Sequence, residues 1–413
     1  MTSEIKQRIE QIRRGEVPER YVKTVLGLAP ANWKRYTFGD IYTERKEPGD
    51  ENLPLLMVSI HSGVSDGEVD AAELPKQVKR IEDKSQYKKA VSGDLVFNMM
   101  RAWQGAIGTV RTTGMVSPAY IVAEPNDKAY PLFMDYYSRT PQMINQIDRQ
   151  SYGVTDFRKR LYWDSFAPIS CTLPPIEEQQ KIAAILTTQD KVIELKEKRL
   201  AEKQRQKKYL MQQLLTGKKR LPGFNGAWKT DCLGKLFFER KETNCENIEM
   251  LAITGTQGII PRKELDLKDN SSEDKSKYLR VCVGDIGYNT MRMWQGVSAY
   301  SNYEGIVSPA YTILKPSSSI NAKYFAYLFK MSEIVFLFYR FSQGLVDDTR
   351  NLKYENFKKI KVCYPPDMKE QTAIAEVLSA ADREIELLQQ DIEQEKRKKK
   401  ALMQLLLTGI VRV

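Results

Sequence analysis

The chain has 413 residues but a single histidine, His61, and no apolar run that approaches the ~20 residues needed to cross a membrane. An H-E-x-x-H zinc motif needs two imidazoles, and a Ser-His-Asp triad would have to use His61. That histidine lies in the turn-rich stretch SIHSGVSDG, which is more typical of a solvated side chain. The glycine patterns of nucleotide-binding loops and of the hydrolase nucleophile are also missing. The sequence therefore carries no visible catalytic apparatus.

Cysteine is sparse as well. Five cysteines occur, none of them in a C-x-x-C pair, and an odd number cannot all form disulfides within one chain. Reduced thiols are typical of a cytoplasmic protein. The N-terminal stretch MTSEIKQRIEQIRRGE is charged from its fourth residue, unlike a secretory signal. We therefore expect a cytoplasmic protein that makes no contact with a membrane.

Positive charge is what the chain has in excess. Its 64 lysines and arginines outnumber 53 aspartates and glutamates, which gives a net charge of +11 and a pI of 9.1. An apolar fraction of 42% excludes a disordered tail, and the length suggests about two or three domains. A basic chain without a catalytic signature predicts binding to an acidic polymer.

An internal repeat organises the sequence. The segment NMMRAWQG at 98–105 recurs as NTMRMWQG at 289–296, which is 191 positions later. The segment VSPAY at 116–120 recurs at 307–311 with the same offset. The motifs ERKE, Pro-Pro and LLTG also recur, with offsets between 191 and 195. A repeat of this length indicates two whole domains rather than a solenoid of small units.

The repeat predicts a division of the chain by element type. Segments such as GDLVFNMM and PLFMDYYSR are typical of a strand after a turn and of a short helix, so the repeated domains are predicted to be α+β. The predicted divisions are an N-terminal helical segment at 1–30, a domain at 31–172, a helical spacer at 173–217, a second domain at 218–363 and a second helical spacer at 364–413.

The two spacers have the apolar periodicity of long helices. Alternating steps of four and three run from Ile182 to Leu214 and from Ile374 to Leu406, and they place apolar residues at most positions. A Pro-Pro pair precedes each helix and a Thr-Gly pair follows it, as expected of helix ends. Because a domain separates them in sequence, we predict that they pair as an antiparallel coiled coil with approximate internal two-fold symmetry.

This arrangement resembles the specificity subunit of Type I restriction–modification enzymes. The resemblance rests on LPPIEEQQKIA at 173–183 and YPPDMKEQTAIA at 364–375, each followed by a long helix that ends in LLTG. The stretch GD-[LI], N-x-MR, QG and VSPAY is similar to the target-recognition domains of that family. The likeness covers nearly the whole chain and has both modules in order.

The resemblance implies a DNA-recognition subunit without chemistry of its own. Each target-recognition domain would bind one half of a bipartite, asymmetric site in double-stranded DNA, and the helices would hold the halves apart. Adenine methylation would belong to two modification subunits that use S-adenosylmethionine, and cleavage to a restriction subunit that uses ATP and Mg²⁺. No cofactor is expected on this chain.

The repeat also selects candidate DNA contacts, because residues identical in both modules should perform a shared task. Arg101 and Gln104 correspond to Arg292 and Gln295. These residue types bind phosphates and base edges, and a contact shared by modules with different half-sites would be to the backbone. The open alternative is that they hydrogen-bond internally and anchor a turn.

Two matching loops are further candidates for contact with the DNA backbone. SYGVTDFRKR at 151–160 carries Arg158, Lys159 and Arg160, and SQGLVDDTRN at 342–351 carries Arg350. Glycine with trailing cations suits a loop that lies against phosphates, whereas the alternative is a solvated helix start.

Recognition of sequence is expected where the modules diverge. Loops 61–89 and 254–280 differ between the copies and are rich in turn formers. The basic candidates there are Lys76, Lys79, Arg80, Lys88, Arg262, Lys263 and Lys277.

Two other functions stay open at this point. The chain could be a freestanding DNA-binding adaptor that works without enzyme partners, or an enzyme such as a nuclease built on carboxylates like Asp94 and Glu124. An amino-methyltransferase is disfavoured because neither Pro-Pro pair belongs to an [ND]-P-P-[YFW] motif.

Overall fold

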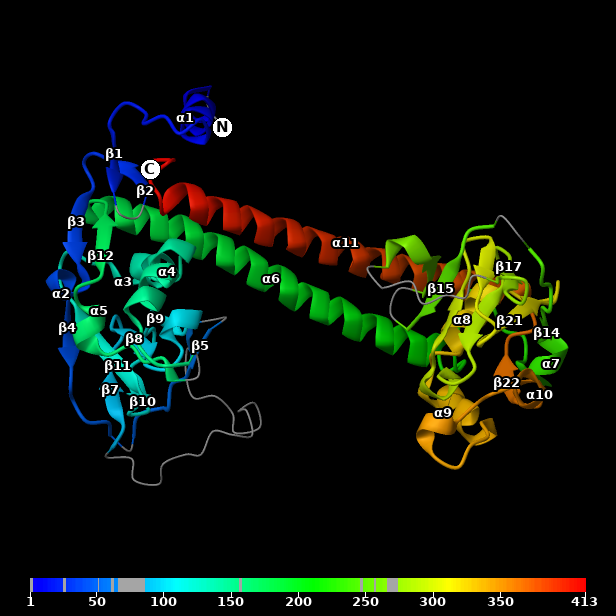
Figure 1. Cartoon of the computed structure of the whole chain (residues 1–413). Helices are drawn as coiled ribbons and strands as arrows, with labels where there is room; N and C mark the ends of the chain where they lie inside the picture. The colour runs from blue at the N-terminus through cyan, green and yellow to red at the C-terminus, as the bar shows by residue number, and fades with distance from the viewer. Residues whose placement is uncertain are drawn as a thin grey trace. The chain divides into compact units, whose positions relative to one another are not determined.

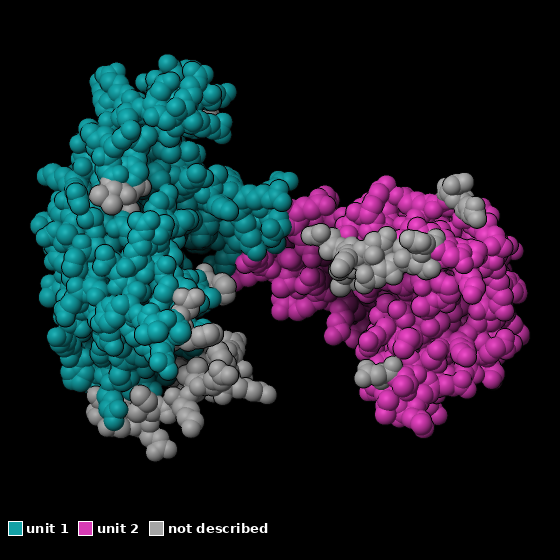
Figure 2. Space-filling view, in the orientation of Figure 1, with its two compact units in different colours: residues 1–195, 392–413 teal, residues 196–391 magenta. Residues whose placement is uncertain are grey.

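The computed structural model divides the chain into two compact units, drawn in separate colours in Figure 2. Unit 1 contains residues 1–195 and 392–413, and unit 2 contains residues 196–391. His61 lies outside the described residues. The structure describes the chain apart from the side chain of Asp348 and residues 1–2, 25–26, 51, 61–62, 66–85, 156–157, 246–247, 256–257 and 266–273.

Unit 1 is built on a four-stranded antiparallel sheet with the order β4-β11-β8-β9. Its strands are β1 (Tyr21–Thr24), β2 (Gly27–Pro30), β3 (Lys34–Thr37), β4 (Tyr42–Arg45), β5 (Val58–Ser59), β6 (Gly63–Val64), β7 (Lys88–Ala90), β8 (Leu95–Asn98), β9 (Ile107–Thr109), β10 (Gly114–Val116), β11 (Tyr120–Pro125) and β12 (Ser170–Leu173). Its short helices are α1 (Ser3–Arg13), α2 (Phe38–Ile41), η2 (Ala102–Gln104), α3 (Pro131–Tyr137), α4 (Pro141–Gln150) and α5 (Trp163–Phe166).

Unit 2 repeats this sheet with the order β14-β21-β18-β19. Its strands are β13 (Lys229–Cys232), β14 (Phe237–Glu239), β15 (Leu251–Thr254), β16 (Gly258–Pro261), β17 (Leu279–Val281), β18 (Ile286–Asn289), β19 (Ser298–Tyr300), β20 (Gly305–Val307), β21 (Tyr311–Pro316) and β22 (Lys361–Tyr364). Its short helices are α7 (Leu233–Leu236), η4 (Arg262–Glu264), η5 (Met293–Gln295), α8 (Ala322–Leu328), α9 (Ser332–Phe341), η6 (Asp347–Thr349) and α10 (Tyr354–Phe357). The predicted tandem α+β domains are confirmed.

Two 39-residue helices, α6 (Ile176–Leu214) and α11 (Met368–Leu406), contribute residues to both units (Figure 1). All twenty positions of the two predicted apolar seams are buried or half-buried. Within unit 1, Gln189 of α6 lies against Glu395 of α11. Within unit 2, Lys196 pairs with Asp391 and Lys207 with Asp382. Partner numbers fall as α6 residue numbers rise in unit 2, and in unit 1 the earlier Glu178 meets the later Arg412, so the segments run antiparallel in each unit.

The helix ends belong to the cores of the α+β domains. In unit 1, Ile182 and Leu186 of α6 and Leu406 of α11 pack in the same cluster as Phe97 and Phe133. Unit 2 has the equivalent cluster around Phe325, with residues from the C-terminal end of α6 and the N-terminal end of α11. Neither helix is therefore a free-standing linker, because burial of its apolar face requires the domains.

The predicted N-terminal helical segment 1–30 needs a correction. Only Ser3–Arg13 is helical, and Tyr21–Thr24 pairs with Gly27–Pro30 as an antiparallel hairpin. The hairpin is tied to the C-terminal end of the chain, since the Tyr21 hydroxyl donates to the Gly409 carbonyl at 2.7 Å. A four-residue strand has little local signature, which explains why the sequence did not reveal the hairpin. Among the described residues, no helix is long and apolar enough to span a membrane.

Candidate nucleic-acid interface

The identical polar residues of the two modules fall into two groups, and the first is structural. Glu178, at the start of α6, is buried and accepts hydrogen bonds of 2.5 and 2.7 Å from the Arg412 guanidinium. The next residue, Gln179, accepts from the Tyr130 amide at 2.8 Å and donates to the carbonyl of Pro174 at 2.9 Å. The polar pair after Pro-Pro thus joins α6 to the first domain and to the C-terminal end of the chain.

Unit 2 repeats these contacts with the helices exchanged. Glu370, at the start of α11, accepts from Arg220 at 2.5 and 2.7 Å. Gln371 accepts from the Asn321 amide at 2.7 Å and donates to the carbonyl of Pro365 at 2.9 Å. Arg220, which follows α6, therefore joins the end of that helix to the start of α11.

In each unit, an ion pair joins the arginine of the ERKE motif to the aspartate of the GD turn, and this contact is also structural. Arg45 donates to the buried carboxylate of Asp94 at 2.7 and 3.2 Å, and Arg240 donates to Asp285 at 2.7 and 3.1 Å. The hydrogen bonds with Asp94 raise the pKa of the Arg45 guanidinium, whereas burial raises the pKa of the Asp94 carboxyl. Residues 44–47 and 239–242 are accordingly scaffold.

The proposed nuclease carboxylates converge on a cation rather than on an open site. Glu124 lies 3.1 Å from Arg45, the same guanidinium that binds Asp94. Across the described part of the chain, no group of three histidine, cysteine or acidic residues could hold a metal ion. Asp94 and Glu124 therefore form part of an ion pair, and this geometry does not support the nuclease hypothesis.

A second group of identical residues lies on a short exposed turn. In unit 1, the Asn98 side chain accepts from the Met100 amide at 2.8 Å, and the Trp103 indole donates to the Met100 carbonyl at 3.0 Å. These two bonds hold the turn that leads into η2. Arg101 and Gln104 point into solvent from it, and no side-chain hydrogen bond or ion pair is found for either in the described structure.

Unit 2 builds the same turn from the second copy of the motif. Asn289 accepts from the Met291 amide at 2.9 Å, and Trp294 donates to the Met291 carbonyl at 2.9 Å. Arg292 and Gln295 are exposed, and within the described residues their side chains have no protein partner. The alternative that these four side chains anchor the turn is therefore not supported, because asparagine and tryptophan do so.

The cation-bearing loops lie against these turns. In the first, backbone hydrogen bonds of 3.0 and 2.9 Å join Tyr152 and Arg160. The Lys159 ammonium lies 4.8 Å from the centre of the Trp103 ring and 2.8 Å from the Asp148 carboxylate, while Arg158 is exposed. Arg160 donates to the carbonyl of Lys159 at 2.9 Å. Of these three cations, Arg158 is the most accessible.

The loop of unit 2 closes in the same way between Gln343 and Asn351, with bonds of 2.9 and 2.8 Å. Arg350, the counterpart of Lys159, lies 3.9 Å from the Tyr339 ring centre and donates to the Tyr339 hydroxyl at 2.8 Å. It also donates to Asp347 at 2.7 Å. The Tyr339 ring in turn contacts Trp294 at 6.1 Å between centres. In each unit the structure therefore brings the predicted turn and the predicted loop together.

The structure describes only part of the divergent loops 61–89 and 254–280. Lys76, Lys79 and Arg80 lie outside the described residues. Lys88 donates to the Tyr120 carbonyl at 2.8 Å, and Lys263 pairs with Glu249 at 2.5 Å. Lys277 is exposed, whereas Arg262 has a partner and its backbone joins Met250. Base recognition by this set stays a prediction.

One contact was missed from the sequence although its signal was present. The Tyr136 hydroxyl donates to Asp190 at 2.6 Å, and Lys399 pairs with the same carboxylate. The Tyr327 hydroxyl makes the equivalent bond to Asp382 at 2.6 Å, and it lies 191 positions after Tyr136. The constant offset could have marked both tyrosines as links between the domains and the paired helices.

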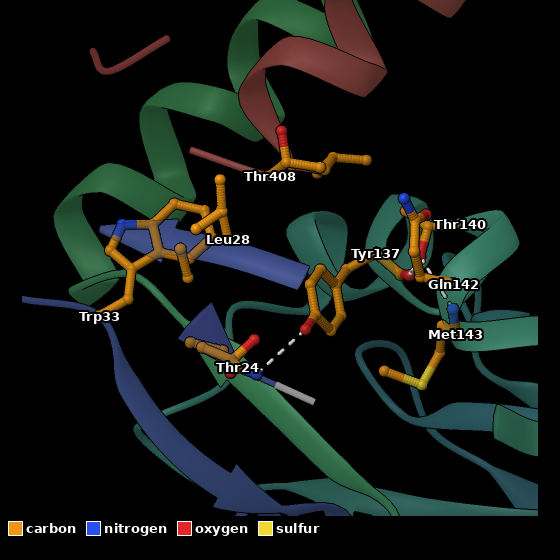
Figure 3. A pocket seen from close by; sticks show the side chains of 11 residues that line it. Thr24, Leu28, Trp33, Tyr137, Thr140, Gln142, Met143 and Thr408 are labelled. Atoms are coloured by element: carbon orange, nitrogen blue, oxygen red, sulfur yellow. Dashed lines mark hydrogen bonds between the residues drawn. The ribbon is translucent and has the colours of Figure 1, made fainter. Parts of the chain in front are cut away.

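Unit 1 contains a small pocket. It lies between the N-terminal hairpin, α4 and the end of α11, and its volume is about 40 Å³. Tyr137 lines the pocket (Figure 3), and its hydroxyl accepts a hydrogen bond of 3.0 Å from the backbone amide of Thr172. This space holds about one water molecule.

The chain is thus a duplicated protein, in which each copy of one α+β domain carries an exposed turn with an arginine and packs against part of both long helices. The sequence profile of the Type I restriction modification DNA specificity domain matches residues 72–205 and 234–396. These residues make up more than half of the chain. The chain therefore belongs to this family and is a DNA-recognition subunit of the Type I restriction–modification class.

Individual relatives align with this chain over nearly its full length. The chain is 23% identical to the putative type I restriction enzyme MjaX specificity subunit of Methanocaldococcus jannaschii, over 96% of this chain and 97% of the relative. It is 24% identical to the type I restriction enzyme MjaVIII specificity subunit of the same organism, with the same coverage.

Solved structures share the fold at lower identity. The S subunit of a Type-I restriction-modification system from M. genitalium matches with a TM-score of 0.56 and 12% identity, over 91% of this chain and 96% of that one. A chain from a structure of a type I R-M system matches with a TM-score of 0.51 and 18% identity, over 93% and 99% of the two chains.

Proposed function

We propose that each α+β domain binds one half of a bipartite, asymmetric site in double-stranded DNA. The observation that carries this proposal is the set Arg101, Gln104, Arg292 and Gln295, which is identical in both modules and exposed. Other identical polar residues, such as Glu178 and Gln179, have internal partners, so burial or folding explains them. Exposed arginine and glutamine suit phosphate oxygens.

Arg158, Lys159, Arg160 and Arg350 extend this surface in the proposal. Cations held on aromatic rings are pre-oriented, so they lose less conformational freedom on binding a phosphate. Base recognition falls to the divergent loops, since the shared residues cannot distinguish two different half-sites.

The paired helices would set the distance between half-sites. Because α6 and α11 are each continuous helices with residues in both units, their length limits how far apart the domains bind. They would also dock two modification subunits. Leu195 on α6 and Leu387 on α11 occupy equivalent positions and are 55% and 65% exposed, which suits a contact with an apolar partner surface.

The chain itself would be non-catalytic. S-adenosylmethionine would bind the modification subunits, and ATP and Mg²⁺ a restriction subunit where one is present. The proposed compartment is the cytoplasm. A purified chain that transfers a methyl group from S-adenosylmethionine to DNA, or cuts DNA, would contradict this part of the proposal.

The helix spacing can be tested by inserting one heptad after Leu195 and one after Asp391. Both points lie at the boundary between the units, so the contacts within each unit are left in place. Seven residues preserve the seam and add about 10 Å to the helices. With DNA rising ~3.4 Å per base pair, the spacer should grow by up to about three base pairs. Sequencing of methylated motifs in cells that carry the variant and its partner subunits gives the result.

The matched control carries the heptad in α6 alone, which should disturb the pairing with α11 and abolish methylation. An unchanged spacer in an active double variant would contradict the distance role. Altered half-sites would contradict the division between helices and domains. A lone chain that binds DNA tightly and recruits no methyltransferase would favour the adaptor.

A further inference from the structure

Each unit places one aliphatic side chain almost wholly in water at the tip of a loop. Val154 in unit 1 is 92% exposed, and Leu345 in unit 2 is 100% exposed. The two residues are 191 positions apart, which is the offset of the repeat. Scattered exposed apolar residues are ordinary, but near-total exposure at the same position of both copies indicates a shared task.

In each unit, described backbone groups before and after the exposed side chain approach one another closely. A Cβ atom on Gly153 would lie 2.4 Å from the Arg158 carbonyl oxygen, and one on Gly344 would lie 2.7 Å from backbone atoms of Thr349. The backbone of Gly344 also has a φ of +145°, a conformation that residues with a side chain rarely adopt. Glycine before the tip therefore lets each loop close on itself, and the following aliphatic residue is held away from the domain.

The residues around each exposed side chain indicate the kind of partner that would bind it. The base of the first loop carries Lys159 on the Trp103 ring, next to the turn with Arg101. The base of the second carries Arg350 on the Tyr339 ring, where it also donates to Asp347. An apolar tip beside a cation complements a polyanion that also has apolar surface, and duplex DNA has both, since bases line its grooves between two rows of phosphates.

We propose that Val154 and Leu345 enter a groove of duplex DNA and pack against base pairs while the cations beside them bind phosphates. This inference rests on the proposed DNA-binding function and adds a contact of a different chemistry. Valine and leucine are both aliphatic, so the contact is common to the modules rather than a means of distinguishing half-sites. Burial of such a side chain stabilises the complex by an amount that corresponds to about tenfold in affinity or more.

The test compares Leu345→Ser with Leu345→Met, and Val154→Ser with Val154→Ile, in complexes with the modification subunits. The probe is a labelled duplex that carries the motif found methylated in host DNA. The serine variants should bind about tenfold more weakly, and the apolar variants should bind like the unchanged protein. The slope of affinity against salt should not change, because no phosphate contact is removed. Unfolding should also be unaffected, since both side chains lie in water.

Serine variants that bind DNA as tightly as the unchanged protein would overturn the proposal. A smaller salt slope would also overturn it, because the substitution would then have displaced a cation. Loss of assembly with the modification subunits at unchanged DNA affinity would identify a protein contact instead. If the unchanged complex fails to bind the duplex, the DNA-binding function itself fails, which is a separate result.

Discussion

Arg412 and Glu178 are 234 positions apart in the chain, yet the guanidinium of the first donates two hydrogen bonds to the buried carboxylate of the second. Arg220 and Glu370 form the same pair in unit 2. In each unit, therefore, the residues that follow one long helix hold the first turn of the other. This clamp explains why a glutamate follows Pro-Pro in both copies.

Arg412→Ala should destabilise unit 1 by about 2 kcal/mol. Removing the guanidinium leaves the Glu178 carboxylate buried without its main partner, which costs ~3–5 kcal/mol in a fully buried pair. Arg412 is partly exposed, so the cost is smaller. Urea unfolding measures the loss, and Arg220→Ala should act similarly. Arg14→Ala is the control, because its ion pair with Glu10 is exposed and a change below about 0.5 kcal/mol is expected. Equal effects of Arg412→Ala and Arg14→Ala would contradict the clamp.

Tyr136→Phe and Tyr327→Phe should each reduce the free energy of unfolding by about 1.5 kcal/mol. Each substitution removes a 2.6 Å hydrogen bond from a hydroxyl to a carboxylate that links a domain to the paired helices. Tyr209→Phe is the matched control, since this tyrosine on α6 is 54% exposed. Thermal unfolding compares the three variants. If Tyr209→Phe has as large an effect, the links contribute nothing specific.

Arg101→Ala and Arg292→Ala should weaken DNA binding equally on all sequences and lower the salt slope by about one each. Both residues are exposed, so stability should change by less than about 0.5 kcal/mol. Affinity is measured between 50 and 200 mM salt, a range in which the unchanged complex should lose about 10³ to 10⁵ in affinity. A folding defect without DNA would show that the side chains are structural after all.

The cysteines should differ in their reactivity towards a thiol reagent. Burial raises the pKa of Cys171 to about 12, because desolvation disfavours the thiolate, which is the reactive form. Cys363 is exposed. At pH 8 the folded protein should therefore be labelled at Cys363, while Cys171 reacts only after unfolding. Peptide mass mapping distinguishes the sites, and rapid labelling of native Cys171 would disprove its burial.

The same pKa gives the direction of a stability effect at high pH. In the folded state the thiol of Cys171 stays protonated up to about pH 12. In the unfolded chain it loses its proton at a lower pH, because the ordinary pKa of a cysteine thiol is 9.0. Between these two pKa values, deprotonation of the unfolded chain lowers the free energy of unfolding progressively as pH rises.

The duplication, the two long helices and the position of their seams could all be predicted from the residues alone. These features depend on local periodicity or on a constant offset, and both can be counted along the chain. The steps from Ile182 to Leu214 predicted the buried face correctly, and the glycines after LLTG, Gly217 and Gly409, have the expected positive φ of 72° and 69°. Family likeness followed from the same local motifs.

The folded structure was needed to separate the identical polar residues that are scaffold from those that are exposed. Asp94 and Arg101 are both polar residues of the repeat, but Asp94 is buried against Arg45 and Arg101 faces solvent. The Arg412–Glu178 pair and the hydrogen bond from Tyr21 to Gly409 could not be predicted from the sequence. The physical reason is that a hydrogen bond between residues far apart in the chain leaves no local pattern, since it depends on where the whole fold brings the two groups.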